Sequence, residues 1–93
     1  MHIASLLVAL EISDGVTLKD KRHVVRSLLD RIRGRFNVGA AEVDQLDSVR
    51  YATIAMVGVA NEHRFLNEMM SKVMDLIEGE PRVVVLDQSL EFM

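Results

Sequence analysis

Basic side chains gather in one short stretch of the sequence. Residues 19–35 contain seven of the eleven Lys and Arg residues and only two acidic residues, whereas the rest of the chain contains four basic and twelve acidic residues. Four of the seven are Lys19, Arg22, Arg26 and Arg33, here called the basic flank. On a helix, which turns by about 100° per residue, these four fall within about 60° of one another. Ammonium and guanidinium groups on one face are suited to phosphate contacts, so the spacing predicts an anion-binding surface.

Other side chains that could perform chemistry are present but poorly placed. His2, His23 and His63 fall in three separate predicted elements, so none pairs with another histidine at metal-ligand spacing, and we expect no metal site. Glu42 and Asp44, as alternate residues of a predicted strand, would share one face, but paired acids are common at strand ends. The serines lack the glycine context of a nucleophile elbow, and there is no phosphate-binding glycine loop. We therefore predict no catalytic residues, no cofactor and no enzymatic activity.

The basic flank lies on a predicted amphipathic helix over residues 17–36. Its apolar residues fall within about 60° of Val25 and form one stripe; they are Leu18, Leu28, Leu29, Ile32 and Phe36. Thr17 is the expected N-cap, with Asp20 three residues later, and Gly34 is the expected stop. Lys21, Arg31 and Arg35 are assigned to the opposite flank of the stripe.

Strand patterns and a second helix complete the chain. Strands are predicted over residues 2–12, 36–43, 50–60 and 82–86, the last continuing through 88–92, with a turn at 13–15 after the first. The second helix is predicted from Asn61, its expected cap, to about Gly79. The order β-α-β-β-α-β predicts an α+β, ferredoxin-like two-layer sandwich, in which two helices cover one face of a four-stranded antiparallel sheet. Residues 1–93 are expected to form a single ferredoxin-like domain.

Composition limits the chemistry further. The chain has no cysteine, which excludes disulfides, iron–sulfur clusters and thiol chemistry, and its 49% hydrophobic content is sufficient for a buried core. The apolar N-terminal segment lacks a basic leader and a cleavage site, and it is too short to span a bilayer. We therefore expect a cytoplasmic protein with no signal peptide and no membrane interaction.

The two strands expected at the centre of the sheet are apolar on both faces. The third strand, for example, has Thr53 as its only polar residue between Tyr51 and Ala60. A sheet covered by helices on one face usually alternates apolar and polar residues, so the open face is predicted to be apolar and covered. Self-association into a homodimer or higher oligomer is the simplest cover, with Ile54 and Met56 at the interface. The alternatives are a tolerable surface of small residues, or a C-terminal tail that folds over this face.

The stretch from residue 17 to residue 44 resembles a bacterial family. The matching residues are Leu18, Lys19, Lys21, Arg22, Val24, Val25, Ser27, Leu28, Leu29, Arg31, Arg33, Arg35, Phe36, Asn37, Val38, Ala41, Glu42, Val43 and Asp44. Thr17, Asp20 and Gly39 depart mildly from its pattern. On these residues the chain is similar to the YlxP-like family of domains of unknown function. The resemblance implies a ferredoxin-like fold and, in many bacteria, a gene neighbourhood beside translation initiation factor two and ribosome-binding factor A, but it implies no activity.

Two interpretations of function follow. The first is a small non-enzymatic module that binds RNA or the ribosome through the basic flank; its alternative is a solvated helix whose charges pair with Glu62, Glu68 and Asp75 of the second helix. An RNA-recognition motif is disfavoured because it needs exposed aromatic residues on the central strands, where the third strand offers only Tyr51. The second interpretation is a homo-oligomeric protein-interaction domain that uses the open sheet face.

Overall fold

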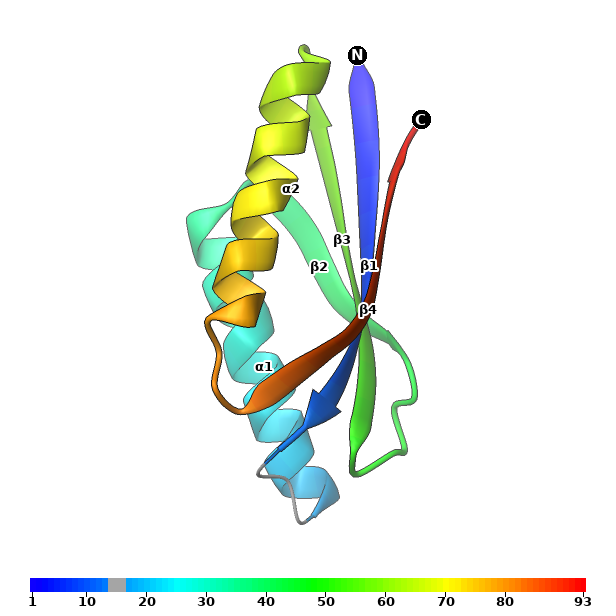
Figure 1. The fold of residues 1–93 in the computed structure, drawn as a ribbon, viewed down its shortest axis with the longest axis vertical. Helices are drawn as coiled ribbons and strands as arrows, with labels where there is room; N and C mark the ends of the chain where they lie inside the picture. The colour runs from blue at the N-terminus through cyan, green and yellow to red at the C-terminus, as the bar shows by residue number, and fades with distance from the viewer. Residues whose placement is uncertain (14–16) are drawn as a thin grey trace.

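The computed structural model describes residues 1–13 and 17–93, and it has the predicted element order. The elements are β1 (His2–Ile12), α1 (Leu18–Arg35), β2 (Val38–Asp44), β3 (Tyr51–Ala60), α2 (His63–Glu78) and β4 (Val83–Phe92). The four strands form one antiparallel sheet in the order β2-β3-β1-β4, and both helices lie on the same side of it (Figure 1). The predicted ferredoxin-like two-layer sandwich is confirmed. Of the turn predicted at 13–15, only the first residue lies within the described part of the chain.

Helix α1 occupies the predicted range, but Gly34 is not the residue that ends it. The Thr17 side chain accepts a hydrogen bond of 3.1 Å from the backbone N–H of Asp20, which satisfies one of the free donors of the first turn. The prediction that Gly34 stops the helix is wrong, because α1 continues through it and Phe36 is the C-cap. Gly34 does not adopt the left-handed conformation that would end a helix there.

Helix α2 packs very closely on β3. Its N-cap is Glu62 and not Asn61, without a side-chain capping bond, whereas Gly79 ends the helix as predicted. Gly58 of β3 lies directly under the helix, where an added Cβ atom would come within 2.8 Å of Cε of Met69. A side chain at this position would therefore have to displace the side chains of α2 that cover the sheet.

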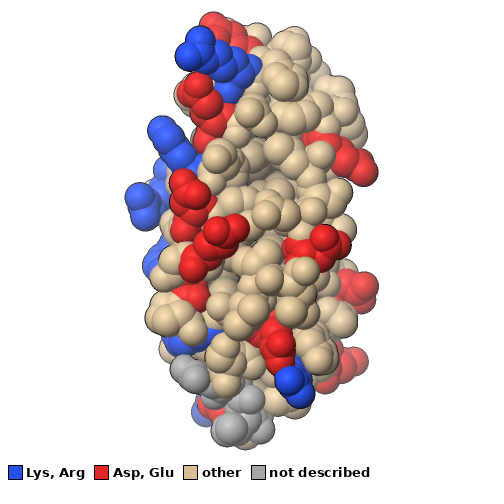
Figure 2. Space-filling model, in the orientation of Figure 1, with Lys and Arg blue, Asp and Glu red and all other residues tan. Residues whose placement is uncertain are grey.

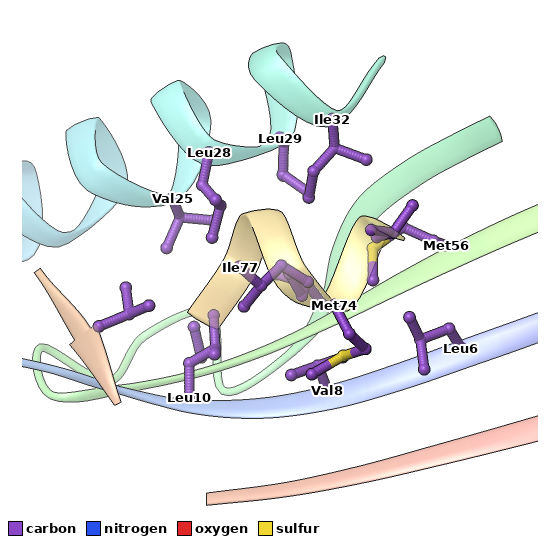
Figure 3. Close-up of a cluster of buried hydrophobic side chains, with 14 of the residues drawn as sticks. Leu6, Val8, Leu10, Val25, Leu28, Leu29, Ile32, Met56, Met74 and Ile77 are labelled. Carbon is purple, nitrogen blue, oxygen red and sulfur yellow. The ribbon is translucent and has the colours of Figure 1, made fainter. Parts of the chain in front are cut away.

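The core lies between the sheet and the helices and is built from alternate strand residues. In the β1–β3 register, Leu6 is opposite Met56 and Val8 is opposite Ile54, and all four side chains point towards the helices. Figure 3 shows Leu6, Val8 and Met56 beneath the apolar stripe of α1 and the inner face of α2. The buried apolar residues of the helices are Val24, Val25, Leu28, Leu29 and Ile32 of α1 and Leu66, Met69, Met70, Val73, Met74 and Ile77 of α2. Each large side chain buried in this way contributes about 1.5–3 kcal/mol of transfer free energy.

The open face of the sheet carries the other set of strand residues. Leu7, Val57 and Val59 are 46, 44 and 53% exposed on this face. The assignment of Ile54 and Met56 to an oligomer interface is therefore wrong, because both are fully buried under the helices. The two rows of β3 are both apolar, so alternation gave no reason to prefer one face. A C-terminal tail folded over the open face is also wrong, since residues 83–92 form β4 beside β1.

Candidate nucleic-acid interface

Helix α1 presents the whole basic flank to solvent. Lys19, Arg22, Arg26 and Arg33 are all exposed, as helical spacing predicted. Arg22, Arg26 and Arg33 line one cleft of about 190 Å³ between α1 and β2, whose floor includes Glu42. Lys19 lies about one turn before Arg22 and outside the lining of this cleft. The structure thus brings together three of the four predicted residues and leaves the fourth on the same flank.

Arg33 differs from the other residues of the flank because its guanidinium group is already occupied. Its Nε and Nη2 atoms donate to the backbone carbonyl of Ala40 at 3.2 and 2.8 Å, and its Nη1 atom donates to Asp30 at 3.0 Å. These bonds tie the last turn of α1 to the edge strand β2. A phosphate at Arg33 would have to share donors that already hold the helix on the strand.

Lys19, Arg22 and Arg26 are the available cations of the flank. Across residues 1–13 and 17–93, none of the three forms a hydrogen bond or an ion pair. The alternative pairing with Glu62, Glu68 and Asp75 of α2 is not found in this part of the chain, and Glu68 instead pairs with Arg64 of its own helix at 3.2 Å. The three charges are therefore solvated, and phosphate contacts would not have to break an internal ion pair.

Beneath the flank lies a buried charged pair that sequence analysis missed. Lys21 is fully buried, and its Nζ atom lies 2.5 Å from Oε2 of Glu42 and donates at 2.8 Å to the backbone carbonyl of Gln45. The contact with Glu42 has the distance of an ion pair but not the direction of a hydrogen bond. The prediction that Lys21 lies on a flank of the stripe is wrong. Lys21 is four residues from Val25 and therefore only about 40° from the centre of the apolar stripe, and this angle was the signal in the sequence that it would be buried.

The opposite side of α1 is held by a second charged cluster. The Glu80 carboxylate, in the loop between α2 and β4, accepts hydrogen bonds from Arg31 of α1 and from Arg82, whose Nη2 and Nε atoms lie at 2.8 and 2.9 Å. Hydrogen bonds from the side chain and backbone of Arg82, the positive charge of Arg82 and a hydrogen bond from Arg31 outweigh the effect of burial and lower the pKa of Glu80 to about 2. This cluster fastens α1 to the start of β4, so Arg31 does not belong to a free basic surface.

The charges of the chain are segregated on the molecular surface. Figure 2 shows Lys and Arg side chains mainly along the left edge, on the side of the helices and interspersed with acidic side chains, whereas the right edge carries acidic side chains on a mostly uncharged face. On the open face, β4 contributes Asp87 and Glu91 and β1 contributes Glu11. An anionic partner would therefore be attracted to the helix side and repelled from the sheet side.

Two smaller predictions are corrected by the structure. The rings of His2 and His63 lie 5.9 Å apart, so two of the histidines do meet in space although they belong to different elements. The side chains of Glu42 and Asp44 do not share a face, because the register of β2 shifts between them and places Glu42 opposite buried Ile54 but Asp44 opposite Thr53. His23 and His63 are exposed, as predicted.

No helix in the described ranges has both the length and the apolar character needed to cross a bilayer. In structure, the chain is similar to a protein named YJCS from structural genomics, with a TM-score of 0.55, 12% sequence identity, and 96% of each chain covered. This similarity concerns the fold alone.

In sequence, the chain is similar to the uncharacterized protein YlxP of Bacillus subtilis strain 168. The two are 25% identical over 72 residues, which cover 77% of this chain and 78% of YlxP. The model of the family described as "Protein of unknown function (DUF503)" matches residues 3–90, a range that runs from Ile3 of β1 to Leu90 of β4. The resemblance seen in residues 17–44 is thereby confirmed, and the chain belongs to the DUF503 family.

Proposed function

We propose that this protein is a small, non-enzymatic RNA-binding module that contacts the phosphate backbone, in free RNA or in the ribosome, through the exposed basic flank of α1. One observation carries the proposal. Of the eleven Lys and Arg residues, all of which lie in the described part of the chain, six form ion pairs, and three of the other five are Lys19, Arg22 and Arg26. The positive charges that are not neutralised internally are thus concentrated on one face.

The geometry of the flank favours backbone contact over base readout. Lys19 and Arg26 are seven residues apart, or about 10 Å along the helix axis, and they and Arg22 all point away from the core. Such charges position a nucleic acid but carry little sequence information. The ribosome enters the proposal through the gene neighbourhood that the family resemblance implies.

The salt dependence of binding tests this proposal quantitatively. Since Arg33 is held by Ala40 and Asp30, we expect three phosphate contacts, and a log–log plot of affinity against salt for single-stranded ribosomal RNA fragments should have a slope of about −2. The variant Arg22→Glu/Arg26→Glu should weaken binding at least tenfold and bring the slope to −1 or shallower. Filter binding between 50 and 200 mM salt measures both quantities.

A matched control separates a local contact from net charge. The variant Arg50→Glu changes the net charge by the same amount as Arg22→Glu alone, at an exposed residue outside α1 that is paired with Glu11. It should bind within about threefold of wild type, whereas Arg22→Glu should bind more weakly than that. Absence of binding by the wild-type chain at low salt, or equal losses in Arg22→Glu and Arg50→Glu, would contradict the proposal.

A second candidate function is homo-oligomerisation through the open sheet face. The observation that favours it is the row of exposed apolar residues on the central strands, where Leu7 is opposite Ala55 and Val57 is opposite Ser5 in the register. Two such faces packed together would bury this row.

The test must use a residue of the exposed row. Met56→Asp would place a charge in the core and unfold the chain, whereas Val57→Asp changes a half-exposed side chain on the open face. We expect the wild-type chain to sediment as a dimer at tens of micromolar and Val57→Asp to sediment as a monomer with an unchanged circular dichroism spectrum. A strictly monomeric wild-type chain would exclude this candidate, and it would leave the RNA proposal intact.

A further inference from the structure

A second cleft, of about 350 Å³, opens between the C-terminal end of α1 and the first half of α2. Arg35, Phe36 and Asn37 line it from the junction of α1 and β2, and Phe65, Met69 and Lys72 line it from α2. In Figure 1 this junction lies beside the middle of α2. Val59 of β3 and Glu68 of α2 complete the lining, so the walls combine two aromatic rings, two further apolar side chains, an amide, two cations and one carboxylate.

Phe65 is the unusual member of this group. It lies in the first turn of α2, where 58% of its surface is exposed, and its ring stacks on no other aromatic ring in the described residues. Phe36, across the cleft, is half-buried against the core, and the guanidinium group of Arg35 lies 5.8 Å from its ring centroid. The cleft thus presents one aromatic face that is free to stack with a flat ligand.

The charges at the rim select an anionic ligand. Arg35 and Lys72 are the other two of the five basic residues that form no ion pair within the described ranges, and both line this cleft. The acidic residue of the lining, Glu68, is paired with Arg64. A flat, apolar surface between two free cations, with the exposed amide of Asn37 beside them, fits a base with its flanking phosphates.

We infer that this cleft binds one unpaired nucleotide of the RNA strand, with the base stacked on Phe65 and its flanking phosphates on Arg35 and Lys72. The inference rests on the proposed function, because it adds a base contact to a strand held by the basic flank. Arg35 lies nine residues after Arg26 on the same helix, about 14 Å further along the axis and on the opposite side of the helix, so a strand that contacts both must cross the exposed face of α1. Asn37 supplies a donor and an acceptor for the edge of the base.

The experiment compares a ten-nucleotide single-stranded RNA with a duplex of the same sequence, whose bases are not free to stack. Phe65→Ala should weaken binding of the single strand by roughly fivefold to a hundredfold and change duplex binding by less than twofold. Leu46→Ala, which removes an exposed apolar side chain outside the cleft, is the matched control and should bind both RNAs like wild type. Lys72→Gln provides a second variant that removes a charge without touching the aromatic ring.

The variants distinguish failure of this inference from failure of the proposed function. Equal affinities of Phe65→Ala, Lys72→Gln and wild type for the single strand would overturn the cleft assignment, even where Arg22→Glu/Arg26→Glu still weakens binding. In the reverse pattern, Phe65→Ala weakens binding and Arg22→Glu/Arg26→Glu does not. That result would support RNA binding in the cleft and would contradict RNA binding by the basic flank. The inference is also overturned if the wild-type chain binds neither RNA, or if the cleft binds an apolar peptide and not the RNA strand.

Discussion

Replacing Lys21 with methionine is expected to lower the free energy of unfolding by about 3 kcal/mol. The ammonium group is fully buried, faces the Glu42 carboxylate and binds the carbonyl of Gln45, a residue held in the left-handed region with a φ of 61°. Its removal leaves a carboxylate that is only 12% exposed without its counter-ion, and such changes cost about 3–5 kcal/mol. We expect the lower end of this range of costs because Glu42 also borders the cleft lined by Arg22 and Arg26, whose positive charges remain near the carboxylate. Urea unfolding at pH 7 measures the loss.

A double-mutant cycle identifies the cause of this loss. Lys21→Met/Glu42→Leu replaces the whole pair with apolar groups, which is often close to neutral in stability, so it should recover at least half of the loss. Lys19→Met, on the exposed side of the same turn, is the control and should stay within about 0.5 kcal/mol of wild type. Additive losses at Lys21 and Glu42, or a loss below 1 kcal/mol for Lys21→Met, would show that the ion pair does not stabilise the fold.

The architecture was predictable because its signals are local and periodic. The stripe around Val25 and the apolar strand runs fix the type and order of the elements, and Thr17 marks the start of α1. Short connections between β2 and β3 then restrict the topology to few arrangements, of which the observed sheet order is one. The exposure of the basic flank followed from the same periodicity, since charged residues outside the apolar stripe of an amphipathic helix face solvent.

The wrong predictions have a different physical origin, because they concern features that depend on how two elements pack or pair with each other. Met56 and Val57 are both apolar, and only the packing of α2 over Gly58 decides which of the two rows of β3 is covered. The register shift in β2, which separates the faces of Glu42 and Asp44, leaves no mark in the sequence. Lys21 was placed with the surface charges because lysine is rarely buried without a partner, and its partner lies 21 residues away.

The clefts were beyond prediction for a similar reason. Phe36, Asn37 and Phe65 belong to segments about thirty residues apart, and none of these segments has a motif that announces a site. What the sequence did contain was the excess of positive charge in α1. The structure divides that excess into charges that hold the fold together, at Lys21, Arg31 and Arg33, and charges that are free to bind a partner.

Glu80 is expected to make the stability of the fold depend on pH in the acid range. Its pKa in the folded state is about 2, below the ordinary value of 4.5 that it has in the unfolded chain, because Arg82 and Arg31 hold the ionised carboxylate. A lowered pKa means that the folded state binds fewer protons, so the stabilisation is present in full above about pH 5 and is lost as the pH falls from 4.5 towards 2. Its size at pH 7 is about 2–3 kcal/mol, and less than half should remain at pH 3.

Glu80→Gln tests this dependence without a change in side-chain size. The variant should be about 2–3 kcal/mol less stable than wild type in urea unfolding at pH 7, and the difference between the two should shrink steadily between pH 5 and pH 2. Glu78→Gln alters an exposed glutamate two residues earlier, at the end of α2, and should differ from wild type by less than about 0.5 kcal/mol throughout. The difference in stability between Glu80→Gln and wild type could instead be the same at pH 7 and at pH 2. Lost packing or lost hydrogen bonds would then explain the effect of the substitution, and the charge of the carboxylate held by Arg31 and Arg82 would not.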